Sequence, residues 1–149
     1  MIERKLKIKA PIDIVFAVVR NFEAYPEFLE TTLSAKERKG ESGIEVDFEV
    51  EVVKKIRYTL AIEEKAPDKV SWSLVSGELM KSNSGAWVLK SLDSETTEAR
   101  YQIDIGFGWL VPKAIIEQVT KSQLPETLKA FKERAENLFH KHEKKAQKI

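Results

Sequence analysis

The stretch KSQLPETLKAF, residues 121–131, places a proline inside what is otherwise one long amphipathic pattern. From Pro112 to about residue 142 the apolar residues follow helical spacing, and a proline is well tolerated where a helix begins. In the interior of a helix a proline removes one backbone hydrogen bond and clashes with the preceding turn, at a cost of about 3 kcal/mol. The pattern therefore predicts a long C-terminal helix that is bent at Pro125.

The N-terminal part of the chain predicts one strand and two short helices. Residues 2–8 alternate between apolar and charged side chains, as a half-buried strand does. Pro11 then opens a helix whose apolar stripe runs from Ile12 to Val19. The segment EAYPEFL, residues 23–29, predicts a second short helix or a turn.

The middle of the chain, from about residue 31 to residue 107, alternates with a period of two. Strands are predicted around residues 31–38, 44–52, 56–62, 71–75, 86–90 and 100–107, with breaks at KGESG, KAPDK, SGELMKSNSG and LDSETT. Short connections make neighbouring strands antiparallel, and clean alternation means that one face of the sheet is covered. The predicted fold is α+β: a curved antiparallel sheet of about six or seven strands wrapped around a long kinked C-terminal helix, in one domain spanning residues 1–149.

Composition limits the classes of function. The chain has 149 residues with 25 basic and 24 acidic side chains, a net charge of +1 that gives no electrostatic basis for direct nucleic-acid binding. It has no cysteine, which excludes disulfides, thiolate zinc sites and a thiol nucleophile. The N-terminus MIERKLKIKAP does not have the apolar core of a signal peptide, and no apolar run approaches the ~20 residues of a membrane span. We therefore expect a cytoplasmic protein.

The bent helix predicts a cavity. A twisted sheet of this size curls, and a straight helix cannot contact a curled sheet along its whole length. A bend at Pro125 lets one half of the helix follow the sheet while the other half stands away from it. The gap between them is the candidate site.

Three segments carry a family resemblance: VVRNFEAYPEFL after the first strand, SGAWVLK on a late strand and PKAIIEQVTKSQLPETLKAFKERAE at the end. With this order of elements, the chain resembles the START-like helix-grip superfamily (SRPBCC), and within it the polyketide cyclase/dehydrase and coenzyme Q-binding branch. The resemblance extends over nearly the whole chain. It implies an apolar pocket between the concave face of the sheet and the long helix, and a lipid, quinone or polyketide as the ligand class.

The candidate ligand-binding residues are those that alternation places on the covered face, together with residues of the helix and of the joint before it. Aromatic side chains on that face can be core or the rigid walls of a ligand site. Tyr58 and Tyr101 carry hydroxyls there and are the candidates for orienting a ligand. Ser122 can be a pocket wall or a solvated notch. The predicted set is Phe48, Tyr58, Trp72, Leu74, Trp87, Leu89, Tyr101, Ile103, Phe107, Trp109, Ile115, Val119 and Ser122.

Three further features leave alternatives open. Trp109 and Leu110, in the segment GFGWLVPK, can plug the mouth of the core, act as a gate, or form an exposed patch that meets a membrane or a partner. We expect a ligand to enter between residues 106–112 and a loop at residues 76–84. Arg4, a cation on the inward side of the first strand, can reach past the sheet edge to water, bind a ligand carboxylate or pair with an internal acid.

The resulting hypothesis is a protein that binds or transports a small hydrophobic or lipid-like molecule, without a cofactor, a metal or a catalytic residue. The enzyme alternative is a polyketide cyclase or dehydratase, in which a pocket tyrosine moves protons. The third alternative is a ribosome-associated or other partner-binding module of the same fold. The sequence contains no nucleophile elbow, phosphate loop or H-E-x-x-H motif, and it predicts neither the ligand nor the oligomeric state.

Overall fold

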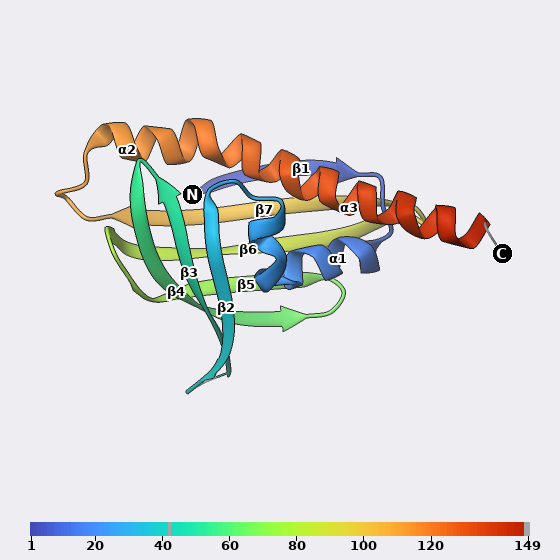
Figure 1. Ribbon diagram of the computed structural model, residues 1–149, viewed down its shortest axis with the longest axis horizontal. Helices are drawn as coiled ribbons and strands as arrows, with labels where there is room; N and C mark the ends of the chain where they lie inside the picture. Colours follow the sequence, from blue (N-terminus) through green and yellow to red (C-terminus); the bar gives the residue numbers. More distant parts are fainter. Residues whose placement is uncertain (42, 148–149) are drawn as a thin grey trace.

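The computed structural model describes residues 1–41 and 43–147, and its strands form one seven-stranded antiparallel sheet (Figure 1). The order across the sheet is β1-β7-β6-β5-β4-β3-β2. The predicted fold class is confirmed. The strands are β1 (Ile2–Ile8), β2 (Thr32–Gly40), β3 (Gly43–Val52), β4 (Lys54–Lys65), β5 (Lys69–Gly77), β6 (Met80–Asp93) and β7 (Thr96–Phe107).

The two short helices after β1 connect the opposite edges of the sheet. They are α1 (Ile12–Arg20) and the 3-10 helix η1 (Phe22–Glu27). The apolar stripe of α1 is buried, as its spacing predicts. The Tyr25 hydroxyl donates a hydrogen bond to the carbonyl of Val19, 2.5 Å away, and so fastens η1 to α1. Pro26 lies inside η1 and does not end it.

The sheet is strongly curved. In Figure 1, β2, β3 and the first part of β4 run steeply, whereas β5, β6, β7 and β1 run along the length of the molecule. Bulges interrupt the pairing of β4 with β5 at Thr59/Leu60 and of β6 with β7 at Met80/Ser82. A bulge bends its strand and increases the local twist. The curvature makes one face of the sheet concave, and the C-terminal helix crosses this face.

The C-terminal helix is interrupted immediately before Pro125, and the interruption is a π-helical turn. The chain forms α2 (Lys113–Glu117), a π-helical turn η2 (Gln118–Gln123) and α3 (Leu124–Gln147). The amide of Leu124 donates to the carbonyl of Val119, five residues back. Pro125, the second residue of α3, has no amide hydrogen to continue the ladder. The π turn therefore takes up the disruption immediately before the proline.

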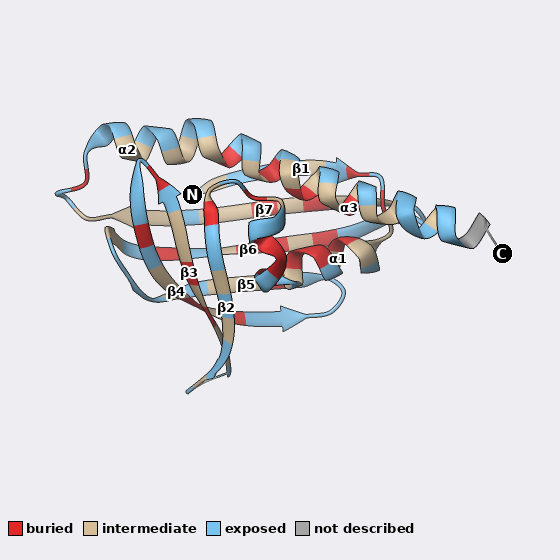
Figure 2. Cartoon of the chain, viewed as in Figure 1, coloured by how far each residue is buried: buried red, intermediate tan, exposed pale blue. Residues whose placement is uncertain are grey.

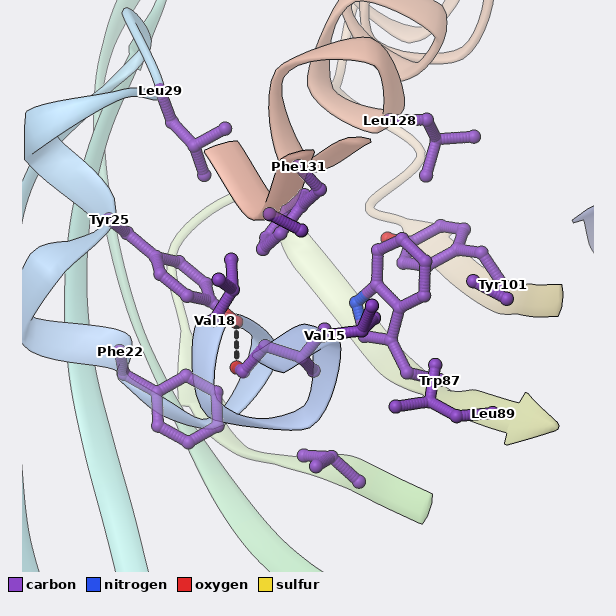
Figure 3. Packing of buried hydrophobic residues seen from close by; sticks show 14 of the residues in the cluster. Val15, Val18, Phe22, Tyr25, Leu29, Trp87, Leu89, Tyr101, Leu128 and Phe131 are labelled. Carbon is purple, nitrogen blue, oxygen red and sulfur yellow. Dashed lines mark hydrogen bonds between the residues drawn. The ribbon is translucent and has the colours of Figure 1, made fainter. Parts of the chain in front are cut away.

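The core lies where α1, η1 and α3 meet the middle of the sheet. Figure 2 shows buried residues gathered along α1, η1, the central part of α3, and β6 and β7. In Figure 3, Phe131 reaches from α3 toward Tyr25 and Trp87. Neither α2 nor η2 has a buried residue. The C-terminal helix is thus packed into the core over part of α3 and stands away from the sheet before it.

One predicted break is wrong. The segment SGELMKSNSG was expected to be a loop, but only Glu78 and Leu79 lie between β5 and β6. Leu79 adopts φ 63°, which reverses the chain in two residues. The serines and lysine that resemble loop composition lie on the β6 strand, where Ser82 and Ser84 alternate with Asn83 and Gly85.

Candidate functional site

A cavity of about 320 Å³ lies between the concave face of the sheet and the segment formed by η2 and the start of α3. This volume is at the lower end of the range of small-molecule sites. Eight of the predicted residues line it, and their role in binding a ligand stays a prediction. They are Phe48, Tyr58, Trp72, Trp87, Tyr101, Ile103, Phe107 and Val119.

Five predicted residues are not in the lining. Leu89 is buried in the packed core, and Leu74 packs against the edge of that core. Trp109 is 83% exposed, so the idea that it plugs the mouth is wrong. Ile115 and Ser122 were placed by extending a regular α-helical stripe through the π turn. The extra residue of that turn moves the inward position from Ser122, which is exposed, to Gln123, which lines the cavity.

The walls of the cavity are aromatic. Phe48 and Tyr58 stack with ring centroids 5.2 Å apart and an interplanar angle of 19°. They are cross-strand partners on β3 and β4, so the strand register itself brings the rings together. On the other side of the site, Trp72 lies 5.7 Å from Tyr101 between ring centroids. These paired rings form flat, rigid surfaces suited to an apolar ligand.

Two tyrosine hydroxyls on these walls have no protein partner. Among the described residues, neither Tyr58 nor Tyr101 makes a side-chain hydrogen bond, whereas Tyr25 does. Burial raises the pKa of Tyr58 to about 12. Burial and, secondarily, the neighbouring Tyr58 raise the pKa of Tyr101 as well. Both hydroxyls therefore remain protonated near neutral pH and can donate a hydrogen bond to a molecule in the cavity.

Asn83 is a polar residue of the cavity that the sequence analysis missed. Its side chain is buried, and its Oδ1 accepts a hydrogen bond from Nε1 of Trp72 at 3.1 Å. Its Nδ2 has a long contact of 3.8 Å to the sulfur of Met80. Extending the inward positions Leu89 and Trp87 back along β6 reaches Gly85 and Asn83, so alternation could have found it. Because residues 76–85 were predicted to form a loop, the alternation was not extended to Asn83.

Gly85 sets the position of the Trp72 ring. The two residues are cross-strand partners, and a Cβ built on Gly85 would lie 2.5 Å from Cζ2 of Trp72. The missing side chain lets the indole lie close to β6, within reach of Asn83. A glycine in the interior of a strand often marks such a close approach.

The helix contributes a row of neutral polar side chains. Thr120, Gln123 and Thr127 line the cavity at intervals of three and four residues, beside Leu124 and Phe131. The Thr120 hydroxyl donates a hydrogen bond to the carbonyl of Ile116 at 2.9 Å. The inward face of the helix is therefore mixed, in contrast to the aromatic face of the sheet.

Charge is nearly absent from the lining. Among the described residues, Asp104 is the only Asp, Glu, Lys, Arg or His in the lining, and it is exposed. Arg4 is exposed and donates to the carbonyl of Glu3, so it does not bind a ligand carboxylate inside the cavity. No group of three His, Asp or Glu side chains in residues 1–41 and 43–147 is placed to hold a metal ion.

The exposed lining residues are Met1, which precedes β1, and Asp104 on β7. Asp104 alternates with Ile103 and Ile105, so its side chain points to the outer face of the sheet. The expected entrance between residues 106–112 and 76–84 is wrong. The amide of Gly108 donates to the carbonyl of Leu79 at 3.1 Å, which ties these two segments together.

Comparison with known structures identifies the architecture. A START superfamily protein from Mycobacterium smegmatis matches with a TM-score of 0.80 and 18% identity, over 92% of this chain and 97% of that one. The Zhui aromatase/cyclase from Streptomyces sp. R1128 also has a TM-score of 0.80 and 18% identity, over 91% and 92% of the two chains. A protein from Thermus thermophilus has a TM-score of 0.75 and 17% identity, over 90% and 95%.

No curated protein sequence matches the chain. Within the described residues, no helix combines the length and the apolar character needed to cross a bilayer. A family model described as polyketide cyclase / dehydrase and lipid transport matches residues 8–132. The matched region runs from the end of β1 into α3 and includes all the lining residues of the cavity except Met1 and Ile2. The chain therefore belongs to the polyketide cyclase/dehydrase and lipid transport family, and its helix-grip fold is that of the START-like superfamily.

Proposed function

We propose that this protein binds a small, uncharged, largely apolar molecule that carries at least one hydrogen-bond acceptor. One observation carries the proposal: an aromatic cavity of about 320 Å³ into which two protonated tyrosines bring hydroxyls that have no partner among the described residues. Neither hydroxyl is a fully buried unpaired atom; both face the accessible space of the cavity, where a ligand oxygen could accept a hydrogen bond from them. The family and the fold are consistent with this function.

The composition of the lining supports a neutral ligand. A carboxylate or phosphate taken into this cavity would lose its hydration, and the described part of the chain places no lysine, arginine or histidine side chain in the lining to compensate. A quinone, a folded polyketide or a neutral lipid would instead place its apolar body against Trp72, Trp87 and Phe48. Its carbonyl or hydroxyl oxygen would accept from Tyr58 or Tyr101.

Thermal unfolding in the presence of matched ligands tests the proposal. A long-chain alcohol or methyl ester should raise the melting temperature in a concentration-dependent manner, and the corresponding fatty acid at pH 7.5 should do so much less. Quinones and aromatic polyketides extend the same panel. Equal stabilisation by acid and ester would contradict the neutral-ligand proposal, and no stabilisation by any member would contradict binding.

Two variants of the same turn provide the control. Val119→Trp fills the cavity from η2, whereas Ser122→Trp adds the same ring on the exposed side of η2. We expect the first variant to lose the ligand response and the second to keep it. Loss in both variants would show that the response does not come from the cavity.

The enzyme alternative is a cyclase or dehydratase, the activity in the names of the family and of one structural relative. With raised pKa values, Tyr58 and Tyr101 are poor general bases near pH 7 and could act only as proton donors. Turnover of a polyketone by the wild type, lost in the Tyr58→Phe, Tyr101→Phe double variant, would favour the enzyme. Binding without turnover favours a carrier.

A further inference from the structure

Two exposed turns near the cavity present large apolar side chains. Trp109 is 83% exposed, Leu110 77% and Val53 69%. Trp109 and Leu110 follow the lining residue Phe107 in the chain, and Val53 follows the lining residue Val52. We call Val53, Trp109 and Leu110 the apolar rim.

The turn that carries Trp109 and Leu110 is well anchored. The amide of Val111 donates to the carbonyl of Gly108 at 3.0 Å, so Trp109 and Leu110 occupy the two central positions of a tight turn. Val111 is buried, and Gly108 is hydrogen-bonded to Leu79. In Figure 1 this turn is at the far left end of the molecule. The two apolar side chains are thus held outward by a fixed backbone.

Neither turn chemistry nor burial explains the apolar rim. The central positions of tight turns favour Gly, Asn, Asp and Pro, and tryptophan and leucine bring no conformational advantage there. Val53 adopts φ 69°, a left-handed conformation that is unfavourable for a β-branched residue and that Gly or Asn would adopt readily. These exposed apolar side chains are therefore available for a contact outside the chain.

We propose that the apolar rim inserts into the surface of a lipid bilayer that contains anionic lipid. The rim consists of separate projections, which a fluid interface accepts individually, whereas a protein partner would need a matching pocket for each. Tryptophan is favoured at the membrane–water interface. Exposed Lys54 follows Val53, and exposed Lys113 lies three residues after Leu110, where they would face anionic headgroups.

The charge contribution is small, and the apolar contribution dominates. Lys55 is the cross-strand partner of Glu51, and Glu117 lies on α2, so only part of the basic charge at this end is uncompensated. The inference of membrane insertion depends only on the exposed side chains of the apolar rim. The purpose of insertion, the exchange of a ligand between bilayer and cavity, rests on the proposed function.

Vesicle binding by the full chain tests this inference. With vesicles of phosphatidylcholine and about 30% phosphatidylserine, we expect co-sedimentation and a blue shift of tryptophan emission, because Trp109 moves from water into lipid. The Trp109→Ser, Leu110→Ser double variant should reduce partitioning at least about tenfold. Val53→Asn, which suits the left-handed turn, should reduce it less.

Leu92→Ser is the matched control. Leu92 is 48% exposed near the turn before β7, and the twelve residues of that strand separate it from the rim by roughly 40 Å. This variant should bind vesicles as the wild type does. No vesicle binding by the wild type, or equal binding by the double variant, would overturn the proposal and would make a protein partner the better explanation of the rim.

The same variants separate this inference from the proposed function. The rim double variant should keep the ligand-induced thermal shift in solution, and Val119→Trp should lose the shift but still bind vesicles. Loss of the solution ligand response in the rim variant would place these residues in the ligand site and contradict a separate membrane role.

Discussion

The rings of Trp87 on β6 and Phe131 on α3 meet with centroids 5.1 Å apart at an angle of 61°. Both side chains are buried, and both line the cavity. This contact joins the helix to the sheet at the inner end of the site. Toward the N-terminal side of Phe131, the helix separates from the sheet and the cavity begins.

Phe131→Ala should lower the free energy of unfolding by about 3–5 kcal/mol, because it removes a buried ring that contacts Tyr25, Phe28 and Trp87. Urea denaturation measures the change. Phe131→Leu keeps most of the volume and should cost clearly less. A loss below about 1 kcal/mol for alanine would show that the helix is not held to the sheet at this point.

Removing the hydroxyls of Tyr58 and Tyr101 should leave the ligand-free protein as stable as before or slightly more stable. Among the described residues neither hydroxyl has a protein partner to lose, and both face accessible space in the cavity, so phenylalanine breaks no protein hydrogen bond. Tyr25→Phe should destabilise by about 1 kcal/mol, since it breaks the bond to Val19. Chemical denaturation of the three variants, all Tyr to Phe, separates these expectations. Destabilisation by Tyr58→Phe equal to that of Tyr25→Phe would contradict them.

The stability of the folded chain should fall at alkaline pH. Burial raises the pKa of Tyr58 to about 12, and burial also raises that of Tyr101 and of Tyr25 above the ordinary value of 10.0. The unfolded chain therefore releases these protons first, so stability is constant below about pH 10 and decreases as the pH rises through the folded pKa values. Each tyrosine can contribute at most about 1.4 kcal/mol per pH unit in that window.

Denaturation midpoints between pH 8 and pH 12 measure this decrease. Tyr58→Phe should have a shallower slope than the wild type between pH 10 and pH 12. A wild-type profile that remains flat to pH 12 would show that the tyrosines are not shielded from water in the folded state.

Gly85→Ala should distort the pairing of β6 with β7 and displace the indole of Trp72, because the new Cβ would lie 2.3 Å from the carbonyl oxygen of Gln102 and 2.5 Å from the Trp72 ring. We expect a loss of about 1–3 kcal/mol from overpacking and a weaker ligand-induced thermal shift, since the ring loses its bond to Asn83. Gly108→Ala is a suitable control, as the nearest atom to its Cβ is 3.9 Å away. An unchanged Trp72 emission spectrum in Gly85→Ala would contradict this account.

Pro125→Ala should convert the π turn into regular α-helix. Alanine restores an amide donor and removes the ring that opposes a continuous ladder. Losing the extra residue of the turn rotates the preceding segment by about 100°, which moves Val119 and Gln123 away from the cavity. Backbone chemical shifts of residues 116–124 would report the change, and ligand response should decrease. Unchanged shifts would mean that packing, and not the proline, maintains η2.

Periodicity alone predicted much of this molecule. Alternation along the strands placed Phe48, Tyr58, Trp72, Trp87 and Tyr101 on one face, and the structure brings them to one cavity. This succeeds because the pleat of a strand fixes side-chain direction wherever the register is regular. It failed at 76–85, where polar composition resembled a loop and Asn83 was overlooked.

The sequence by itself determined the order of elements, the covered face of the sheet and the existence of an interruption near Pro125, because these follow from local periodicity and from the chemistry of proline. Tertiary structure decided that the interruption is a π turn ending at Gln123, that Trp109 points to solvent, and that Gly108 closes the expected entrance against Leu79. These features depend on where distant segments meet and on a helical phase that changes by one residue. Neither is encoded in any local pattern.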